Sequence, residues 1–260
     1  MADHSHNGNQ HGTPEAFEVR VLRQDGPGQA SYWERHRVSY EPDMNVISVL
    51  QRIAANPVTA DGKRVTPVAW DCNCLEEVCG ACTMLVNGRV RQSCSALVDQ
   101  LSEPIVLTPM AKFPVVRDLI VDRSRMFEDL KKIRGWVPIQ GTYDLGPGPR
   151  IAPAAQEVAY TLSTCMTCGC CVDACPNVNA GTKFIGPAAI SQARLFNLHP
   201  TGASNATERL ETLMEPGGIS ECGNAQNCVE VCPKEIPLTT SIGAMGRQVT
   251  RHAFRKLFST

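Results

Sequence analysis

Three tight groups of cysteines limit what this 260-residue chain can fold into. Written with the number of residues between them, they are Cys74-x4-Cys79-x2-Cys82 with Cys94 beyond, Cys165-x2-Cys168-x2-Cys171-x3-Cys175, and Cys222-x5-Cys228-x3-Cys232. A proline follows the last cysteine of the second and third groups. The first spacing is typical of plant-type [2Fe–2S] sites, and the other two resemble the paired runs of bacterial two-cluster ferredoxins. The sequence therefore predicts three iron–sulfur clusters, an arrangement suited to moving single electrons.

Two other uses of cysteine fit this pattern less well. The 13 cysteines are an odd number, and residues 1–12 are polar and lack the apolar segment of a signal peptide, so a secreted disulfide framework is disfavoured. Zinc is the better rival, because cysteines two residues apart also suit tetrahedral zinc. A run of four cysteines that ends in Cys-Pro favours iron instead.

The first cluster is predicted to be held by Cys74, Cys79, Cys82 and Cys94. Gly80 has no side chain, so the backbone can approach the cluster and donate N–H bonds to its sulfides. As a ligand, Cys72 would break the plant-type spacing, and we expect it to be a small packed thiol.

The second and third groups are expected to exchange one ligand. In two-cluster ferredoxins the cysteine before the proline binds the other cluster. A [4Fe–4S] cluster is thereby assigned to Cys165, Cys168, Cys171 and Cys232. The remaining site receives Cys175, Cys222 and Cys228. Because Cys171 keeps the two-residue spacing and Cys170 breaks it, Cys170 is the second cysteine without a cluster.

The third site has one ligand too few for a complete cube. Ala225 stands where the repeat requires a fourth cysteine, and a methyl group cannot bind iron. We therefore expect the corner iron to be missing, which gives a [3Fe–4S] cluster. A labile [4Fe–4S] cluster with a water or hydroxide ligand is the alternative.

The hydrophobic pattern predicts a small N-terminal sheet crossed by one helix. The strands are expected at Phe17–Leu22, Arg35–Tyr40, Thr83–Val86, Arg89–Arg91 and Ile105–Leu107. The pair Asn87-Gly88 is typical of a type I′ hairpin between the third and fourth strands. Asp43 is expected to cap a helix that ends near Pro57.

The pattern becomes helical from about Phe113. The apolar residues spaced as on one long amphipathic helix are Val116, Leu119, Ile120, Phe127 and Leu130. Further helices are predicted over Pro187–Leu198, Asn205–Met214 and Leu238–Leu257, and Gly141–Pro153 is expected to be a connector. We thus predict an α+β chain with a disordered tail (1–14), a [2Fe–2S] ferredoxin-type domain (15–112) and a helical domain that binds the [4Fe–4S] and [3Fe–4S] clusters (113–260).

Charge and motifs exclude several functions. The net charge of −1 does not favour binding to nucleic acid. No stretch approaches the roughly 20 apolar residues that span a bilayer. The chain lacks the Gly-x-Gly-x-x-Gly fingerprint of dinucleotide binding and any evident set of residues for dicarboxylate chemistry, so we predict no catalytic residue within it.

Two segments beyond the cysteine spacing carry a family resemblance. Trp-Asp-Cys-Asn-Cys-Leu-Glu-Glu-Val-Cys-Gly-Ala-Cys (70–82) and Lys-Phe-Ile-Gly-Pro (183–187) resemble the iron–sulfur subunits of succinate dehydrogenase and fumarate reductase. The resemblance extends from about Phe17 to Phe258 and implies a β-grasp domain followed by an α-helical, bacterial-ferredoxin-like domain. A subunit of a related fumarate reductase or of another flavin dehydrogenase, and a free ferredoxin-like carrier, are the alternatives.

The resemblance also implies partners. Electrons would pass between an FAD-containing flavoprotein subunit, which handles succinate or fumarate, and a membrane quinone, by way of the [2Fe–2S], [4Fe–4S] and [3Fe–4S] clusters in that order. A cytochrome b anchor subunit would hold the chain peripherally at the cytoplasmic side of the bacterial inner membrane.

The resemblance has one informative departure. Ubiquinone-using relatives place a tryptophan soon after the Cys-Pro step and a histidine after the first cysteine of the third group. Here the segment from Cys175 to Lys183 has no tryptophan, and the second position is Gly223. The chain instead resembles menaquinone-linked forms, which pair with a single di-haem cytochrome b. Pro176 is expected to line the quinone pocket.

Overall fold

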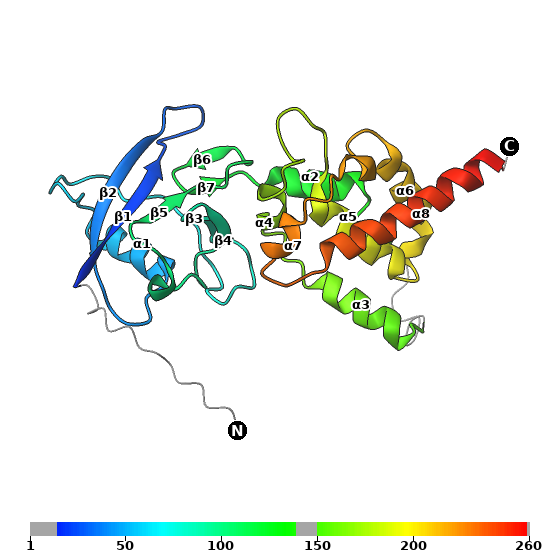
Figure 1. Ribbon diagram of the computed structural model, residues 1–260, viewed down its shortest axis with the longest axis horizontal. Coiled ribbons are helices and arrows are strands. Elements are labelled where there is room, and N and C mark those ends of the chain that lie inside the picture. Colours follow the sequence, from blue (N-terminus) through cyan, green and yellow to red (C-terminus); the bar gives the residue numbers. More distant parts are fainter. Residues whose placement is uncertain (1–14, 139–149, 259–260) are drawn as a thin grey trace, which may run out of the picture.

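The computed structural model describes residues 15–138 and 150–258 of the chain. The predicted tail (1–14) and most of the predicted connector at Gly141–Pro153 lie outside these residues. A part built on a sheet and a part built from helices lie side by side (Figure 1). This arrangement confirms the predicted combination of a β-rich N-terminal part with a helical C-terminal part.

A five-stranded sheet with the order β2-β1-β5-β3-β4 forms the N-terminal part. Its strands are β1 Ala16–Arg23, β2 Tyr32–Ser39, β3 Thr83–Val86, β4 Arg89–Gln92 and β5 Ile105–Thr108. β1 runs parallel to β5, and the other neighbouring strands are antiparallel. All the strands predicted in this part are therefore present. The β3–β4 hairpin turns at the predicted Asn87-Gly88 pair, where both residues have positive φ.

The helix α1, Val46–Ala55, covers one face of this sheet and buries its apolar side against β1. Its cap is Asn45, whose Oδ1 accepts the N–H of Ser48 at 2.9 Å. The prediction that Asp43 caps the helix is wrong. A capping side chain must stand directly before the first helical residue, and Asp43 lies further ahead in a turn with φ of 63°.

The long helix predicted from Val116 to Leu130 is wrong in its first half. Residues β6 Val115–Arg117 and β7 Ile120–Val121 pair as a small hairpin, and the helix α2 begins only at Ser124 and ends at Lys132. The hydrogen bonds of Asp118 fix the hairpin conformation of this segment. Its buried carboxylate accepts the Nε–H of Arg23 at 2.9 Å and the N–H of Ala69 at 2.8 Å. These tertiary bonds outweigh the local helical spacing. We propose that the first domain extends through Val121 rather than ending at residue 112.

The C-terminal part consists of helices around a central one, α5 Gly186–Leu198. Besides α2, which also contacts α5, the others are α3 Pro153–Ser163, α4 Cys170–Asp173, α6 Ala206–Met214, α7 Asn227–Glu230 and α8 Leu238–Phe258. α5 contacts α3, α4, α6 and α8, and the last of these runs out from the body at its C-terminal end (Figure 1). The three helices predicted for this part are confirmed. Within residues 15–138 and 150–258, no helix has both the length and the apolar character that a membrane span requires.

The two parts share a core and several hydrogen bonds. Val90, Met110 and Phe113 from the first part belong to the apolar core of the second. The N–H of Lys112 donates to Asp173 Oδ1 at 2.9 Å, and its ammonium group donates to the carbonyl of Cys175. These contacts attach the sheet directly to the cysteine-bearing loops of the helical part.

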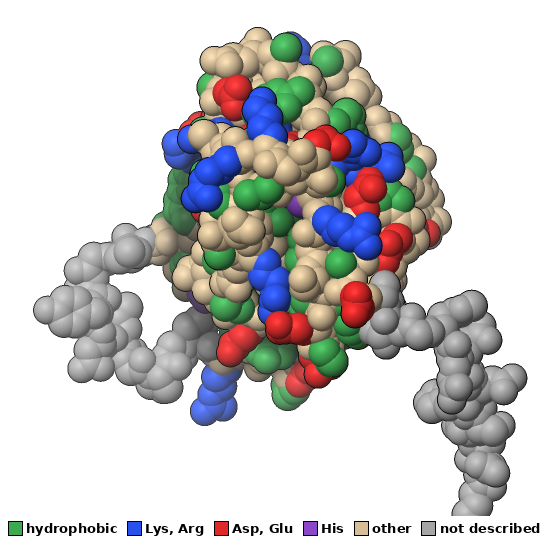
Figure 2. All heavy atoms as spheres, turned by 90° about the vertical axis from the view of Figure 1, so that its left-hand side faces the viewer, with side chains coloured by type: hydrophobic (Ala, Val, Ile, Leu, Met, Phe, Trp, Pro, Cys, Tyr) green, Lys and Arg blue, Asp and Glu red, His purple; other side chains and the backbone are tan. Residues whose placement is uncertain are grey.

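The surface at the sheet end of the molecule carries charges of both signs. Figure 2 views this end, and basic and acidic side chains are interspersed over it without one sign covering the face. A mixed field of this kind steers neither anions nor cations over long distances.

Candidate iron–sulfur sites

The loop before β3 aims backbone N–H groups at cysteine sulfurs. Cys74 Sγ accepts from the amides of Glu76 at 3.4 Å, Val78 at 3.3 Å and Cys79 at 3.2 Å. These bonds lower the pKa of the Cys74 thiol to about 7, and the bond from Glu76 contributes most to the shift. Because N–H donors favour the thiolate, which is the metal-binding form, the loop suits a ligand at Cys74.

The β3–β4 hairpin brings the other two cysteines of the first group to the same loop. Cys82 directly precedes β3 and Cys94 follows β4, and both are buried in a small core with Ile47 of α1. Burial raises the pKa of Cys94 to about 11, and the nearby sulfurs of Cys82 and Cys74 add to the rise. The four predicted ligands of the first cluster therefore lie close together.

Cys72 is not the packed thiol that its sequence position predicts. Its side chain is exposed, as are those of its neighbours Asp71 and Asn73. The segment reaches the cysteine loop along the surface, so a short side chain finds no core to enter.

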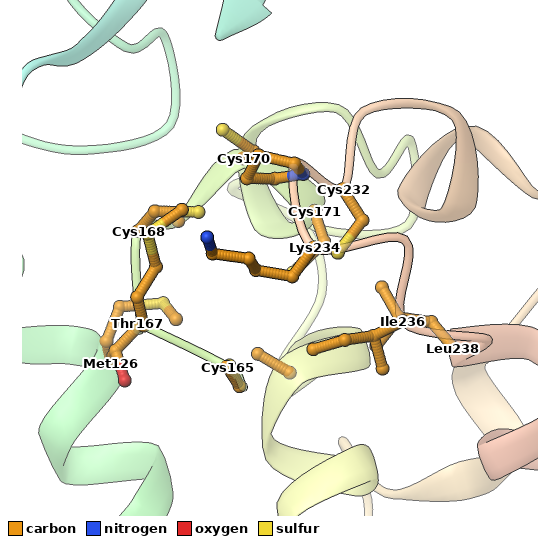
Figure 3. Close-up of a pocket in the computed structure, with 14 residues that line it drawn as sticks. Met126, Cys165, Thr167, Cys168, Cys170, Cys171, Cys232, Lys234, Ile236 and Leu238 are labelled. Carbon is orange, nitrogen blue, oxygen red and sulfur yellow. The ribbon is translucent and has the colours of Figure 1, made fainter. Parts of the chain in front are cut away.

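A cavity in the helical part joins cysteines from two separate groups. Its lining includes Cys165, Cys168, Cys171 and Cys232 (Figure 3). Burial raises the pKa of Cys171, and the sulfurs of Cys168, Cys165 and Cys232 contribute to the rise. The rest of the lining is mostly apolar, including Met126, Ile236 and Leu238. A net-negative cluster in such a wall would be shielded from water while its ligands reach it from several directions.

Cys170 lines the same cavity from a different position. Its side chain is fully buried, and its sulfur lies 3.6 Å from Nε2 of Gln92. It also hydrogen bonds to Cys168, which raises the pKa of Cys170 and, as the main cause, lowers that of Cys168 to about 7. Cys170 thus packs beside a predicted ligand and contacts the N-terminal part through Gln92.

The third set of cysteines gathers next to the second. Burial raises the pKa of Cys228 to about 11, with further contributions from the neighbouring sulfurs of Cys175 and Cys222. The side-chain Nδ2 of Asn227 donates to the carbonyl of Ala174 at 3.2 Å, and this bond connects the two loops. Ala225 is exposed in the loop between Cys222 and Cys228. The three cysteines grouped by the predicted exchange are thus neighbours.

The cysteines are spread more widely than around a single ion. Across the described residues, no group of three or more histidine, cysteine, aspartate or glutamate side chains is compact enough to hold one metal ion. Thiolates around a cluster stand further apart than those around a single ion, because each of them binds a different iron.

Sequence reasoning missed three polar residues at these sites. Lys234 enters the cavity of Cys168 and Cys232 (Figure 3), Gln92 reaches Cys170 from β4, and Arg123 binds the loop of the first group. Lys234 follows Cys-Pro directly and could have been found from that position. No local signal marks Gln92 or Arg123, because their partners are far away in the sequence.

Gly80 lies where the first cysteine loop meets the second. Its φ is 71°, and a Cβ built on it would lie 2.6 Å from Cβ of Cys168, so Gly80→Ala is expected to force the two loops apart. The positive φ alone costs an alanine about 1–2 kcal/mol, and overpacking adds about 1–3 kcal/mol. Gly62→Ala is the matched control, because its φ is 81° and nothing lies within 4 Å of the added Cβ.

Thermal unfolding and the iron and sulfide content per chain measure this difference. Gly80→Ala should unfold at a lower temperature than Gly62→Ala and retain less iron. Equal losses in the two variants would show that the contact with Cys168 is unimportant.

Comparison with known proteins supports both parts of the fold. Residues 18–128 match the family model of a 2Fe-2S iron-sulfur cluster binding domain, and residues 160–236 match that of a 4Fe-4S dicluster domain. The chain is 60% identical to the succinate dehydrogenase iron-sulfur subunit of Bacillus subtilis over 92% of its length and 95% of that protein. It is 26% identical to the fumarate reductase iron-sulfur subunit of Wolinella succinogenes over 89% and 96%.

A solved structure has the same fold. A chain of the Mycobacterium smegmatis Sdh1 complex in the apo form superposes with a TM-score of 0.78 at 24% identity, covering 93% of this chain and 98% of that one. The predicted fold class, a [2Fe–2S] ferredoxin domain followed by a helical two-cluster domain, is thereby confirmed.

Proposed function

As the chain belongs to the iron–sulfur subunits of succinate dehydrogenases and fumarate reductases, we propose that it carries single electrons between a flavin-containing partner and a membrane quinone. The observation that carries this proposal is the grouping of cysteines from three distant segments into separate sets, all of them buried or half-buried. When bound, the clusters supply one-electron redox chemistry. The protein supplies thiolates, N–H donors and an apolar wall, while the dicarboxylate reaction belongs to the complex.

We assign the ligands as the sequence predicted. The [2Fe–2S] cluster is held by Cys74, Cys79, Cys82 and Cys94. The [4Fe–4S] cluster is held by Cys165, Cys168, Cys171 and Cys232. The [3Fe–4S] cluster is held by Cys175, Cys222 and Cys228. The shared cavity of Cys165 and Cys232, and the influence of Cys175 and Cys222 on the pKa of Cys228, support the exchange of ligands between the groups.

The three-iron site makes a specific prediction. Ala225→Cys is expected to convert the [3Fe–4S] cluster to [4Fe–4S], because the exposed loop between Cys222 and Cys228 gains the thiolate that the spacing lacks. The paramagnetic signal of the oxidised three-iron cluster, recorded by electron paramagnetic resonance (EPR), should largely disappear. Ala225→Ser, which adds a weaker ligand of similar size, is the control and should keep that signal. An unchanged signal in Ala225→Cys would contradict the ligand assignment.

The proposed partners are an FAD flavoprotein subunit and a cytochrome b anchor, which would hold the chain peripherally at the cytoplasmic side of the bacterial inner membrane. We favour menaquinone over ubiquinone and a di-haem anchor. A Cβ at Gly223 would lie 2.9 Å from Oδ1 of Asn177, so the histidine of ubiquinone-using relatives would require Asn177 to move.

Pro176 is exposed directly after Cys175, and its carbonyl accepts a hydrogen bond from Nδ2 of Asn179 at 3.0 Å. This exposed turn supports a role for Pro176 in lining the quinone pocket.

The experiment is to isolate the complex anaerobically and measure its metals, spectra and activity. We expect one [2Fe–2S], one [4Fe–4S] and one [3Fe–4S] EPR signal, succinate-dependent quinone reduction, and menaquinone and two haems in the preparation. Bound zinc without iron would end the proposal. Ubiquinone in the preparation would overturn only the choice of quinone.

A further inference from the structure

The loops of the first and second cysteine groups touch at Gly80 and Cys168. A Cβ on Gly80 would lie 2.6 Å from Cβ and 2.8 Å from Cα of Cys168, so only glycine permits this approach. Gly80 directly follows Cys79, a proposed ligand of the [2Fe–2S] cluster, and Cys168 is a proposed ligand of the [4Fe–4S] cluster. A path through the protein from the ligand Cys79 to the ligand Cys168 therefore crosses one van der Waals contact, at Gly80.

Arg123 holds this contact from one side. It stands in the segment between the hairpin β6–β7 and the helix α2, and its side chain is half-buried. Its Nη1 donates to the carbonyl of Gly80 at 2.6 Å, and its Nη2 donates to the carbonyl of Ala81 at 2.6 Å. Two bonds from one planar guanidinium to neighbouring carbonyls fix both the position and the orientation of the loop.

A second set of bonds holds Gly80 through the hairpin. Thr83 Oγ1 donates to the same Gly80 carbonyl at 2.7 Å, and Gln92 Nε2 donates to Thr83 Oγ1 at 2.8 Å. Gln92 also lies 3.6 Å from the sulfur of Cys170. The Gly80 carbonyl is therefore fixed from both sides, and one of these connections ends next to Cys168.

We propose that Arg123 is a positioning residue for electron transfer, which clamps the [2Fe–2S] loop against Cys168 and places a positive charge beside both clusters. This inference rests on the ligand assignment proposed above. With both clusters bound, Cys79 would hold the donor of one electron and Cys168 would hold its acceptor, and the transfer would need no proton and would make or break no bond. The rate of electron tunnelling falls steeply when a gap opens between atoms along the path. The rate of transfer between the two clusters therefore depends on the contact between Gly80 and Cys168.

The two effects of Arg123 can be separated by substitution. Its charge favours the reduced, more negative state of a cluster, so removing it should shift the midpoint potential to lower values. Lysine keeps the charge but cannot form the two bonds of a planar guanidinium. Arg123→Gln should therefore alter both the potentials and the transfer rate, whereas Arg123→Lys should alter mainly the rate.

The test uses the intact complex with Arg123→Gln, Arg123→Lys and the control Arg117→Gln. Arg117 is the last residue of β6; its side chain is 46% exposed, and its Nε lies 3.8 Å from Oδ2 of Asp118, so it keeps away from the Gly80 carbonyl. Potentiometric titration followed by EPR gives the midpoint potential of each cluster, and rapid freezing after mixing with succinate gives the rate at which the [4Fe–4S] cluster is reduced. We expect Arg123→Gln to shift both potentials downward and to slow the transfer by about tenfold, equivalent to about 1.4 kcal/mol of activation free energy.

Arg123→Lys should keep potentials near those of the native complex and still slow the transfer. Native potentials and a native rate in Arg123→Gln would overturn the inference, and so would an equal effect of Arg117→Gln. If Arg123→Gln does not assemble, a native rate in Arg123→Lys overturns the clamp. The absence of cluster signals from the native complex would instead refute the proposed ligand assignment itself.

Discussion

Replacing Cys79 by alanine should abolish the two-iron cluster while leaving the signals of the other two. Cys79 stands in the middle of the loop, where its sulfur accepts the amides of Cys74 at 3.5 Å and Ala81 at 3.4 Å. A methyl group leaves one iron with an open position, and the amides that were directed at the sulfur lose their acceptor. Reduction of the purified complex, followed by EPR, should show no [2Fe–2S] signal, and the iron content should fall by about two atoms per chain.

Cys72→Ala is the matched control for this experiment. Cys72 lies two residues before Cys74 but is exposed, so its thiol can be removed without changing the loop. The [2Fe–2S] signal should remain. Its loss in Cys72→Ala, or its survival in Cys79→Ala, would show that the ligand set of the first cluster is wrong.

The second large effect is expected at Cys232, which belongs by sequence to the third group. Cys232→Ala should remove the [4Fe–4S] signal, because Cys232 lines the cavity of Cys165, Cys168 and Cys171 (Figure 3). The alanine deprives that cluster of its only ligand from another segment. The electron path from the first cluster would then be broken, so succinate-dependent quinone reduction should fall to background.

Two comparisons make this test specific. Cys175→Ala should instead remove the three-iron signal, since Cys175 is grouped with Cys222 and Cys228. Cys170→Ala, which removes a buried thiol of the same cavity, should leave all three signals in place. Selective loss of the three-iron signal in Cys232→Ala would contradict the exchange of ligands between the second and third groups.

The assignment of the cysteine sets follows from local spacing, because a cluster requires a compact loop. Four or two residues between ligands allow the backbone to turn around the metal. In the first loop, the backbone turns at Leu75, Glu77 and Gly80, which have positive φ. The alternation in β1 and the Asn87-Gly88 pair are likewise local signals, and both were read correctly.

The prediction from local sequence failed where hydrogen bonds to distant residues determine the backbone conformation. The apolar spacing of Val116, Leu119 and Ile120 is typical of a helix. However, the carboxylate of Asp118 accepts hydrogen bonds from Arg23 and Ala69, and the segment forms a hairpin. Burying the guanidinium of Arg23 requires a paired carboxylate, because an unpaired buried charge costs several kcal/mol, roughly 3–5 when one partner is removed. The sequence does not reveal that the two residues meet.

The amino-acid sequence by itself predicts the three cysteine sets, the order of sheet and helices, and the lack of a fourth thiol at Ala225, because each of these depends on residues a few positions apart. Only the tertiary structure decided that Cys72 is exposed, that Gly80 touches Cys168, and that Arg123 binds the carbonyls of Gly80 and Ala81. The last two features arise where the sheet part meets the helical part. Docking depends on the shapes and hydrogen bonds of surfaces assembled from distant segments, which no local pattern encodes.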